Sequence, residues 1–125
     1  MTAEEHLYDV DEANALLPSL RERLARIRDA RQVILREAVV VREKVVGDGG
    51  GTDAGRDYWD ATATLRAELE RLAGESIILR DPESGLVDFP AEREGERVYL
   101  CVRVGEDRVA NWHPLDTGFS SRRPL

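Results

Sequence analysis

Residues 17–46 read LPSLRERLARIRDARQVILREAVVVREKVV, and their apolar positions decide the fold. The apolar side chains recur every three or four residues, at Leu17, Leu20, Leu24, Ile27, Ile34, Ala38, Val41 and Val45. This spacing, sustained over about four heptads, is typical of a helix with a coiled-coil seam. It predicts one long helix that begins at Asp9, whose carboxylate can cap the first amides. Either residues 9–17 form a short separate helix or the helix kinks near Pro18, because proline cannot donate a helical hydrogen bond.

Glycines at 47, 49, 50 and 51 end this first helix, because glycine is a poor helix former. A second apolar seam follows, and Gly74 supplies its C-terminal stop. That seam consists of Tyr58, Ala61 or Thr62, Leu65, Leu69 and Leu72. Residues 9–75 are therefore predicted to form an antiparallel helical hairpin with a glycine-rich loop at 47–55.

After residue 75 the apolar period changes from helical to extended. Short strands are predicted at 76–80, 86–90 and 96–104, then a turn at 105–107, a return strand at 108–113 and an irregular tail. The predicted fold class is α+β, with the long helical hairpin packed on a small antiparallel β-meander. A chain of 125 residues makes one domain, which we place at 1–125 with the meander and tail at 76–125.

Composition limits the possible partners and the compartment. The formal net charge is −7, which disfavours binding to nucleic acid or to anionic membranes. The arginines between residues 21 and 31 alternate with acids, so we interpret them as a solvated helix face. Cys101 is the single cysteine, and the N-terminus lacks the apolar run of a signal peptide. We expect an acidic, cytoplasmic protein.

The last hairpin gathers the residues that could carry chemistry. If Val104 lies opposite Arg108, one strand face is apolar and joins the core, with Val98, Leu100, Val102, Ala110 and Trp112. The opposite face then carries Tyr99, Cys101, Arg103, Asn111 and His113. We expect His113 to lie near Asp88 or Glu106 and near Arg122. A cysteine beside a histidine could be a nucleophile, and Asp88, Glu106 and His113 could instead hold a divalent metal.

The chain resembles a bacterial and archaeal family known as domain of unknown function 2203. The resemblance lies in residues 12–18 (EANALLP), 85–91 (GLVDFPA), 98–101 (VYLC), Gly105-Glu106, Trp112-His113, Gly118-Phe119 and Arg122. Val102 departs from the pattern, since many relatives are expected to carry tryptophan there. The resemblance implies no established activity. It does imply that Asp88, Cys101, Glu106, Trp112, His113 and Arg122 belong to one recurring pattern.

Three functions are consistent with these observations. The long seam favours a non-enzymatic module that self-associates through its helices as a homodimer. An alternative is a metal- or small-anion-binding protein whose site includes Asp88, Tyr99, Cys101, Glu106, Asn111, His113 and Arg122. A third is a small enzyme that uses Cys101 and His113. No cofactor is evident from the sequence, and a divalent metal belongs to the second alternative.

Overall fold

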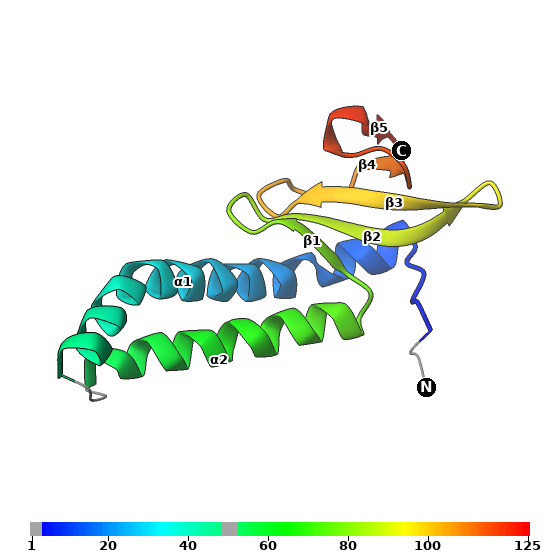
Figure 1. The fold of residues 1–125 in the computed structure, drawn as a ribbon. Coiled ribbons are helices and arrows are strands. Elements are labelled where there is room, and N and C mark those ends of the chain that lie inside the picture. Colours follow the sequence, from blue (N-terminus) through cyan, green and yellow to red (C-terminus); the bar gives the residue numbers. More distant parts are fainter. Residues whose placement is uncertain (1–3, 49–52) are drawn as a thin grey trace. The chain divides into compact units, whose positions relative to one another are not determined.

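The computed structural model describes the backbone of residues 4–48 and 53–125, and the side chains of residues 4–38 and 55–125. Two helices precede a five-stranded antiparallel sheet, as the α+β prediction requires (Figure 1). The elements are α1 (Val10–Asp48), α2 (Asp53–Gly74), β1 (Ile78–Asp81), β2 (Leu86–Arg93), β3 (Glu96–Arg103), β4 (Asn111–Pro114), the 3-10 helix η1 (Phe119–Ser121) and β5 (Arg123–Pro124). They form two compact units: Met1–Leu24 with Arg71–Leu125, and Ala25–Glu70.

Helix α1 begins where the sequence predicts. The Asp9 carboxylate accepts a hydrogen bond of 2.7 Å from the amide of Glu12, which satisfies one of the orphan donors of the first turn. The helix continues through Pro18, whose exposed ring faces solvent, so the proline does not divide it. The side chains of the predicted seam positions Val41 and Val45, and residues 49–52 of the glycine-rich loop, lie outside the described part of the chain.

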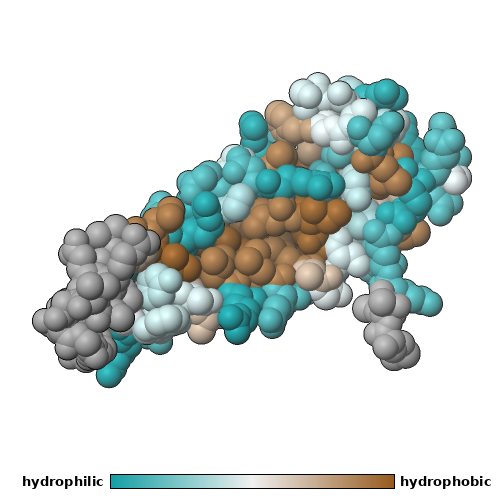
Figure 2. Space-filling view, in the orientation of Figure 1, coloured by the Kyte–Doolittle hydropathy of each residue, from teal (hydrophilic) through white to brown (hydrophobic). Residues whose placement is uncertain are grey.

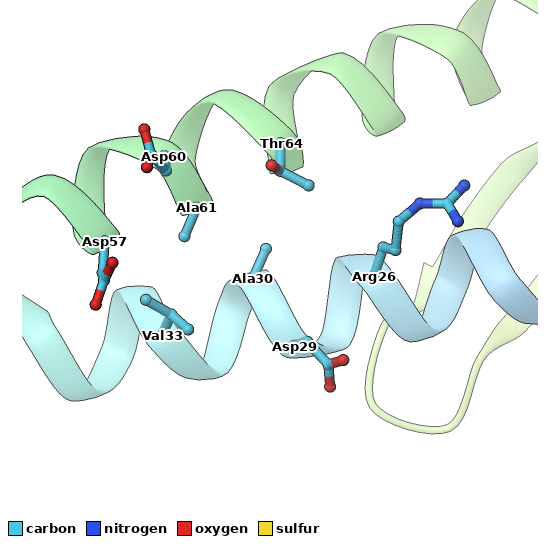
Figure 3. A pocket seen from close by; sticks show the side chains of 8 residues that line it. All are labelled: Arg26, Asp29, Ala30, Val33, Asp57, Asp60, Ala61 and Thr64. Atoms are coloured by element: carbon cyan, nitrogen blue, oxygen red, sulfur yellow. The ribbon is translucent and has the colours of Figure 1, made fainter.

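The Ala25–Glu70 unit is a pair of antiparallel helical segments. Arg26 of α1 donates to Glu68 of α2 at 3.0 Å, and Ile27, Ala30 and Ala61 are buried. Ala30 and Ala61 face each other with small side chains, and a groove of about 350 Å³ remains between the helices (Figure 3). Apolar side chains line its floor, and Asp29, Asp57, Asp60 and Arg26 lie along its rims.

The sheet is a meander with the strand order β1-β2-β3-β4-β5. Strand β2 extends to Arg93, three residues beyond the predicted end, and pairs along its whole length with β3. The two strands are joined at Glu94 and Gly95, whose φ angles of 54° and 80° suit a tight two-residue hairpin turn. Strand β1 begins at Ile78, two residues later than predicted.

The last strand pair confirms most of the predicted register. Tyr99 lies opposite His113, Leu100 opposite Trp112 and Cys101 opposite Asn111. The return strand, however, begins at Asn111 and not at 108. The backbone between β3 and β4 is hydrogen-bonded to α1 instead: Arg21 donates to the carbonyls of Val104 and Glu106, and Asn14 accepts from the amide of Val109. The predicted tight turn at 105–107 is therefore part of a wider loop.

Two residues placed in the core by the sequence lie nearer the surface. Ala110 is exposed because it precedes β4. Trp112 is half-buried, with the guanidinium groups of Arg93 and Arg123 at 4.9 and 5.2 Å from its ring. The tail is more regular than predicted, because it contains η1 and because β5 pairs with β4.

The unit formed by Met1–Leu24 and Arg71–Leu125, which we call the sheet-bearing unit, includes one end of each helix in its core. The Tyr8 ring packs edge-on against Phe89 at 5.0 Å, and its hydroxyl donates to the carbonyl of Glu75 at 2.7 Å. Arg23 is 1% exposed and donates to the Glu75 carboxylate at 2.8 Å. The interpretation of the arginine run as a solvated face is wrong at Arg23, because tertiary contacts override the helical pattern there. Other buried residues of this unit include Leu17, Leu20, Leu72, Val87, Phe89, Leu100 and Val102.

Candidate functional site

Three neighbouring strands bring an aspartate, a cysteine and a histidine together. Asp88 of β2 lies opposite Cys101 of β3, and His113 of β4 is the diagonal neighbour of Cys101. Each residue is only 1% exposed. One donor atom from each, a carboxylate oxygen, the thiol sulfur and a ring nitrogen, lies within 4.8 Å of the other two. We call Asp88, Cys101 and His113 the buried triad.

His113 has a hydrogen-bond acceptor at each ring nitrogen. Its Nδ1 lies 2.8 Å from the carbonyl oxygen of Pro114, and its Nε2 lies 3.0 Å from Oδ2 of Asp88. Both partners accept only, so the contact to Pro114 calls for a proton on Nδ1 and the contact to Asp88 calls for a proton on Nε2. A cation between Nε2 and Asp88 would take the place of the second proton.

The two oxygens of Asp88 have different surroundings. Oδ2 accepts from Nε of Arg80 at 2.8 Å and faces His113. Oδ1 is buried and has no hydrogen-bond partner among the described residues. A buried carboxylate oxygen is costly to leave unpaired, because it has lost its water. Asp88 therefore has one oxygen held in place and another available to a ligand.

The Cys101 thiol is protonated in this environment. Burial first, and the neighbouring Asp88 carboxylate second, raise its pKa to about 12. Arg122 acts in the opposite direction but is outweighed. A reactive cysteine needs a lowered pKa, whereas the pKa of Cys101 is raised. By itself it is a poor nucleophile but a well-placed ligand atom, because a bound metal deprotonates the thiol.

Glu106 and Arg122 form a separate pair beside the triad. The two guanidinium nitrogens of Arg122 donate to the two carboxylate oxygens of Glu106 at 2.8 and 3.1 Å. This bond lowers the pKa of Glu106 from its ordinary value, and the backbone amide of Arg103 donates to the same carboxylate at 2.8 Å. The structure thus places His113 beside Asp88, while Glu106 is bonded to Arg122 and is not one of the triad's donors.

Tyr99 and Asn111 lie at the edges of the triad. The centres of the Tyr99 and His113 rings are 5.5 Å apart, and the two rings are tilted against each other. The guanidinium carbon of Arg80 lies 5.2 Å from the centre of the Tyr99 ring. Asn111 is half-buried opposite Cys101. Both residues share the sheet face of the triad, as the sequence predicts, and pack around it.

Arg80 contacts the triad, and its sequence context does not predict this. The register between β1 and β2 shifts between Leu79 and Asp81, so Arg80 lies at a bulge. A bulge redirects a side chain, and here Arg80 reaches Asp88. Strand alternation alone could not have found it. The signal available was an arginine within a short apolar strand, eight residues before a strand aspartate.

A pocket of about 320 Å³ adjoins the triad. Asp88 and Cys101 contribute to its wall, together with Arg80, Leu86 and residues 115–119 of the tail. The guanidinium groups of Arg103 and Arg122 each lie 4.2 Å from the centre of the Phe119 ring. The two donors of the triad that face this pocket are thus within reach of a small molecule.

None of the helices in the described part of the chain combines the length and apolar character needed to cross a membrane.

Comparison of the sequence with known proteins identifies a family. No curated protein and no solved structure matches the sequence. A family model does match, over residues 6–125, and its description is uncharacterized conserved protein (DUF2203). Because this match covers nearly the whole chain, the protein belongs to the DUF2203 family.

Proposed function

We propose that the protein binds a divalent transition metal, with zinc as the best fit, through Asp88, Cys101 and His113. The observation that carries the proposal is the buried triad, whose three donor atoms lie within 4.8 Å of one another. Carboxylate, thiolate and imidazole are the three ligand types that zinc takes in proteins. Glu106, one of the ligands expected from the sequence, is replaced in this set by Cys101.

The surroundings of His113 support metal binding. Metal-ligating histidines donate the other ring N–H to a carbonyl or carboxylate, which fixes the ring and its tautomer. The contact of 2.8 Å between Nδ1 and the Pro114 carbonyl is of this kind. A cation at Nε2 would replace the second proton and would also meet the unpaired Oδ1 of Asp88.

The geometry calls for a small adjustment. Bond lengths of 2.0–2.3 Å place the donors of a tetrahedral zinc site about 3.5 Å apart. Separations of up to 4.8 Å therefore have to shorten by about an ångström, which side-chain rotation can supply. Three protein ligands would leave one position open, as in reactive zinc sites and unlike closed structural ones.

A zinc titration tests the proposal. The purified full-length chain, stripped of metal, competes for Zn²⁺ with a chromophoric chelator. We expect one zinc per chain, and Cys101→Ser and His113→Gln should weaken binding by about 100-fold or more, since even changes beyond the ligands cost about 10- to 100-fold.

Glu106→Gln is the matched control. It removes a carboxylate near the triad that is bonded to Arg122 instead, so zinc affinity should stay within about threefold. Circular dichroism would verify that each variant folds. Failure of the wild-type chain to bind zinc, or equal affinity in Cys101→Ser, would contradict the proposal.

Self-association through the helices is a second candidate, favoured by the surface of the Ala25–Glu70 unit. Leu35 and Trp59 are 66% and 62% exposed, and the groove between the helices has an apolar floor. Figure 2 shows the hydropathy of one face of the molecule, on which apolar side chains lie beside hydrophilic ones. Apolar patches of this kind are typical of interaction surfaces.

The charges of this unit favour a second copy as the partner. Residues 25–38 carry four arginines and two acids, whereas residues 55–70 carry four acids and two arginines. Two copies could therefore pair the first helix of one with the second helix of the other, with opposite net charges in contact. The grooves would meet in a four-helix arrangement.

Sedimentation equilibrium at micromolar concentration tests this assembly. We expect twice the chain mass of 14.0 kDa. Val33→Glu adds a charge inside the groove beside the rim aspartates and should give a monomer, whereas Gln32→Glu adds the same charge at the exposed neighbouring position and should not. A monomeric wild-type chain would contradict the assembly.

A further inference from the structure

The pocket beside the buried triad offers a route to two of its ligands. Asp88 and Cys101 line it, whereas His113 does not. If a metal occupies the triad, the ligand position left open by three protein donors can be reached from this side. The inference below rests on the proposed metal site.

The charges around the pocket suit an anion once the metal is bound. Three guanidinium groups are near: Arg80 in the wall, and Arg103 and Arg122 in contact with the ring of Phe119, which is also in the wall. The opposing acids are Asp88 itself, Glu106, which is bonded to Arg122, and Asp116. The side chain of Arg80 remains 44% exposed although its Nε is bonded to Asp88. Its remaining nitrogens can meet a carboxylate, which guanidinium binds with matched geometry.

The rest of the wall suits a short apolar body. Leu86, Leu115 and Phe119 contribute apolar surface, and Thr117 contributes a hydroxyl. A volume of about 320 Å³ lies at the lower end of the range for small-molecule sites. This size excludes large cofactors and nucleotides and fits an acid with a few carbon atoms.

We infer that the pocket lined by Arg80, Leu86 and Phe119 binds a small organic carboxylate, whose oxygen completes the coordination of the metal held by Asp88, Cys101 and His113.

Cobalt substitution makes the inference measurable. The visible absorption of Co²⁺ depends on its ligands, so the cobalt-loaded full-length chain is titrated with butyrate, acetate, inorganic phosphate and chloride. Butyrate should change the spectrum saturably. It should bind about tenfold more tightly than acetate, because its two additional methylene groups are buried against the apolar wall.

Two variants at exposed tail positions locate the binding. Thr117→Trp places a large ring in the pocket wall and should abolish the response to butyrate while leaving cobalt affinity unchanged. Ser120→Trp is the control, because this exposed residue does not contribute to the wall, and its response should equal that of the wild type.

The outcomes separate this inference from the proposed function. If neither zinc nor cobalt binds, the metal proposal fails and the inference fails with it. If cobalt binds but butyrate leaves its spectrum unchanged, only the inference is overturned. A response to phosphate or chloride without one to butyrate would overturn the carboxylate assignment, and a full response in Thr117→Trp would overturn the location.

Discussion

The two units of the molecule bury different kinds of side chain. In the sheet-bearing unit, Arg23, Asp88 and His113 are each 1% exposed, among large apolar residues that include Phe89. In the described part of the Ala25–Glu70 unit, the buried residues are Ile27, Ala30 and Ala61, whereas large apolar side chains such as Leu35 and Trp59 lie at the surface. Burying an ionisable group costs free energy unless it is paired, and an exposed apolar group forgoes the gain of burial.

This contrast separates two roles. The sheet-bearing unit has the volume of core needed to hold polar groups in fixed positions, which a binding site requires. The helical unit, Ala25–Glu70, buries few side chains in its described part and exposes large apolar ones, which supports the proposed self-association. The following predictions test the contrast, beginning with the largest expected effect.

Phe89→Ala should destabilise the protein by about 3–5 kcal/mol, because it leaves a cavity where a phenyl ring that is 0% exposed is removed. Urea unfolding at neutral pH measures the change. Trp59→Ala, at a position 62% exposed in the helical unit, is the matched aromatic truncation and should cost about 0.5 kcal/mol or less. Equal losses would remove the contrast between the units.

Excess zinc should stabilise the wild-type chain against heat. A free concentration of 100 times the dissociation constant contributes about 2.7 kcal/mol if the metal binds only the folded state. Differential scanning calorimetry with and without Zn²⁺ should show a raised melting temperature that Cys101→Ser loses. Equal zinc-dependent shifts in both proteins would place the binding elsewhere in the chain.

Glu75→Ala should lower the free energy of unfolding by about 2 kcal/mol, because it removes a carboxylate that is bonded to Arg23, whose side chain is 1% exposed. The loss is smaller than for a fully buried pair because Glu75 is 35% exposed. Glu68→Ala removes the partner of Arg26, whose side chain is 47% exposed, and should cost about 0.5 kcal/mol. Chemical unfolding of both variants compares the two arginine pairs directly. A larger loss in Glu68→Ala would show that the burial of the arginine does not decide the difference.

Glu106→Gln should change the pH dependence of stability mainly at acid pH. The bond from Arg122 lowers the pKa of Glu106 in the folded state, so the pair stabilises the protein above the ordinary glutamate pKa of 4.5. That contribution disappears as the pH falls through the lowered pKa. Melting temperatures measured between pH 7 and pH 2 should therefore fall less steeply for Glu106→Gln over this window. Parallel profiles would contradict the pKa shift.

The elements could be predicted from the sequence because their patterns are local. Leu20, Leu24 and Ile27 repeat at helical spacing, and the alternation from Val98 to Arg103 placed Cys101 and His113 on one face. The same alternation misplaced Ala110, because the contacts from Arg21 and Asn14 to the loop before β4 come from a distant helix. Long-range hydrogen bonds of this kind leave no periodic signal.

The site could be predicted only in part. The sequence predicts His113 near Asp88 or Glu106, and the structure places it beside Asp88. The ion pair from Arg80 to Asp88 depends on a bulge, which the sequence of a short strand does not reveal. The burial of Arg23 depends on Glu75, which is 52 residues away in the sequence. The sequence could not decide between Glu106 and Cys101 as the proposed metal ligand, because Glu106 is bonded to Arg122, and the position of the tail that carries Arg122 has no sequence signal.

X-ray absorption at the zinc edge of the loaded protein identifies the atoms that surround the metal. We expect one sulfur at about 2.3 Å, from Cys101, and nitrogen or oxygen ligands at about 2.0–2.1 Å, from His113, Asp88 and one exogenous ligand. The sulfur shell should vanish in Cys101→Ser. A wild-type spectrum with nitrogen and oxygen alone would contradict the assignment of Asp88, Cys101 and His113 as a metal site.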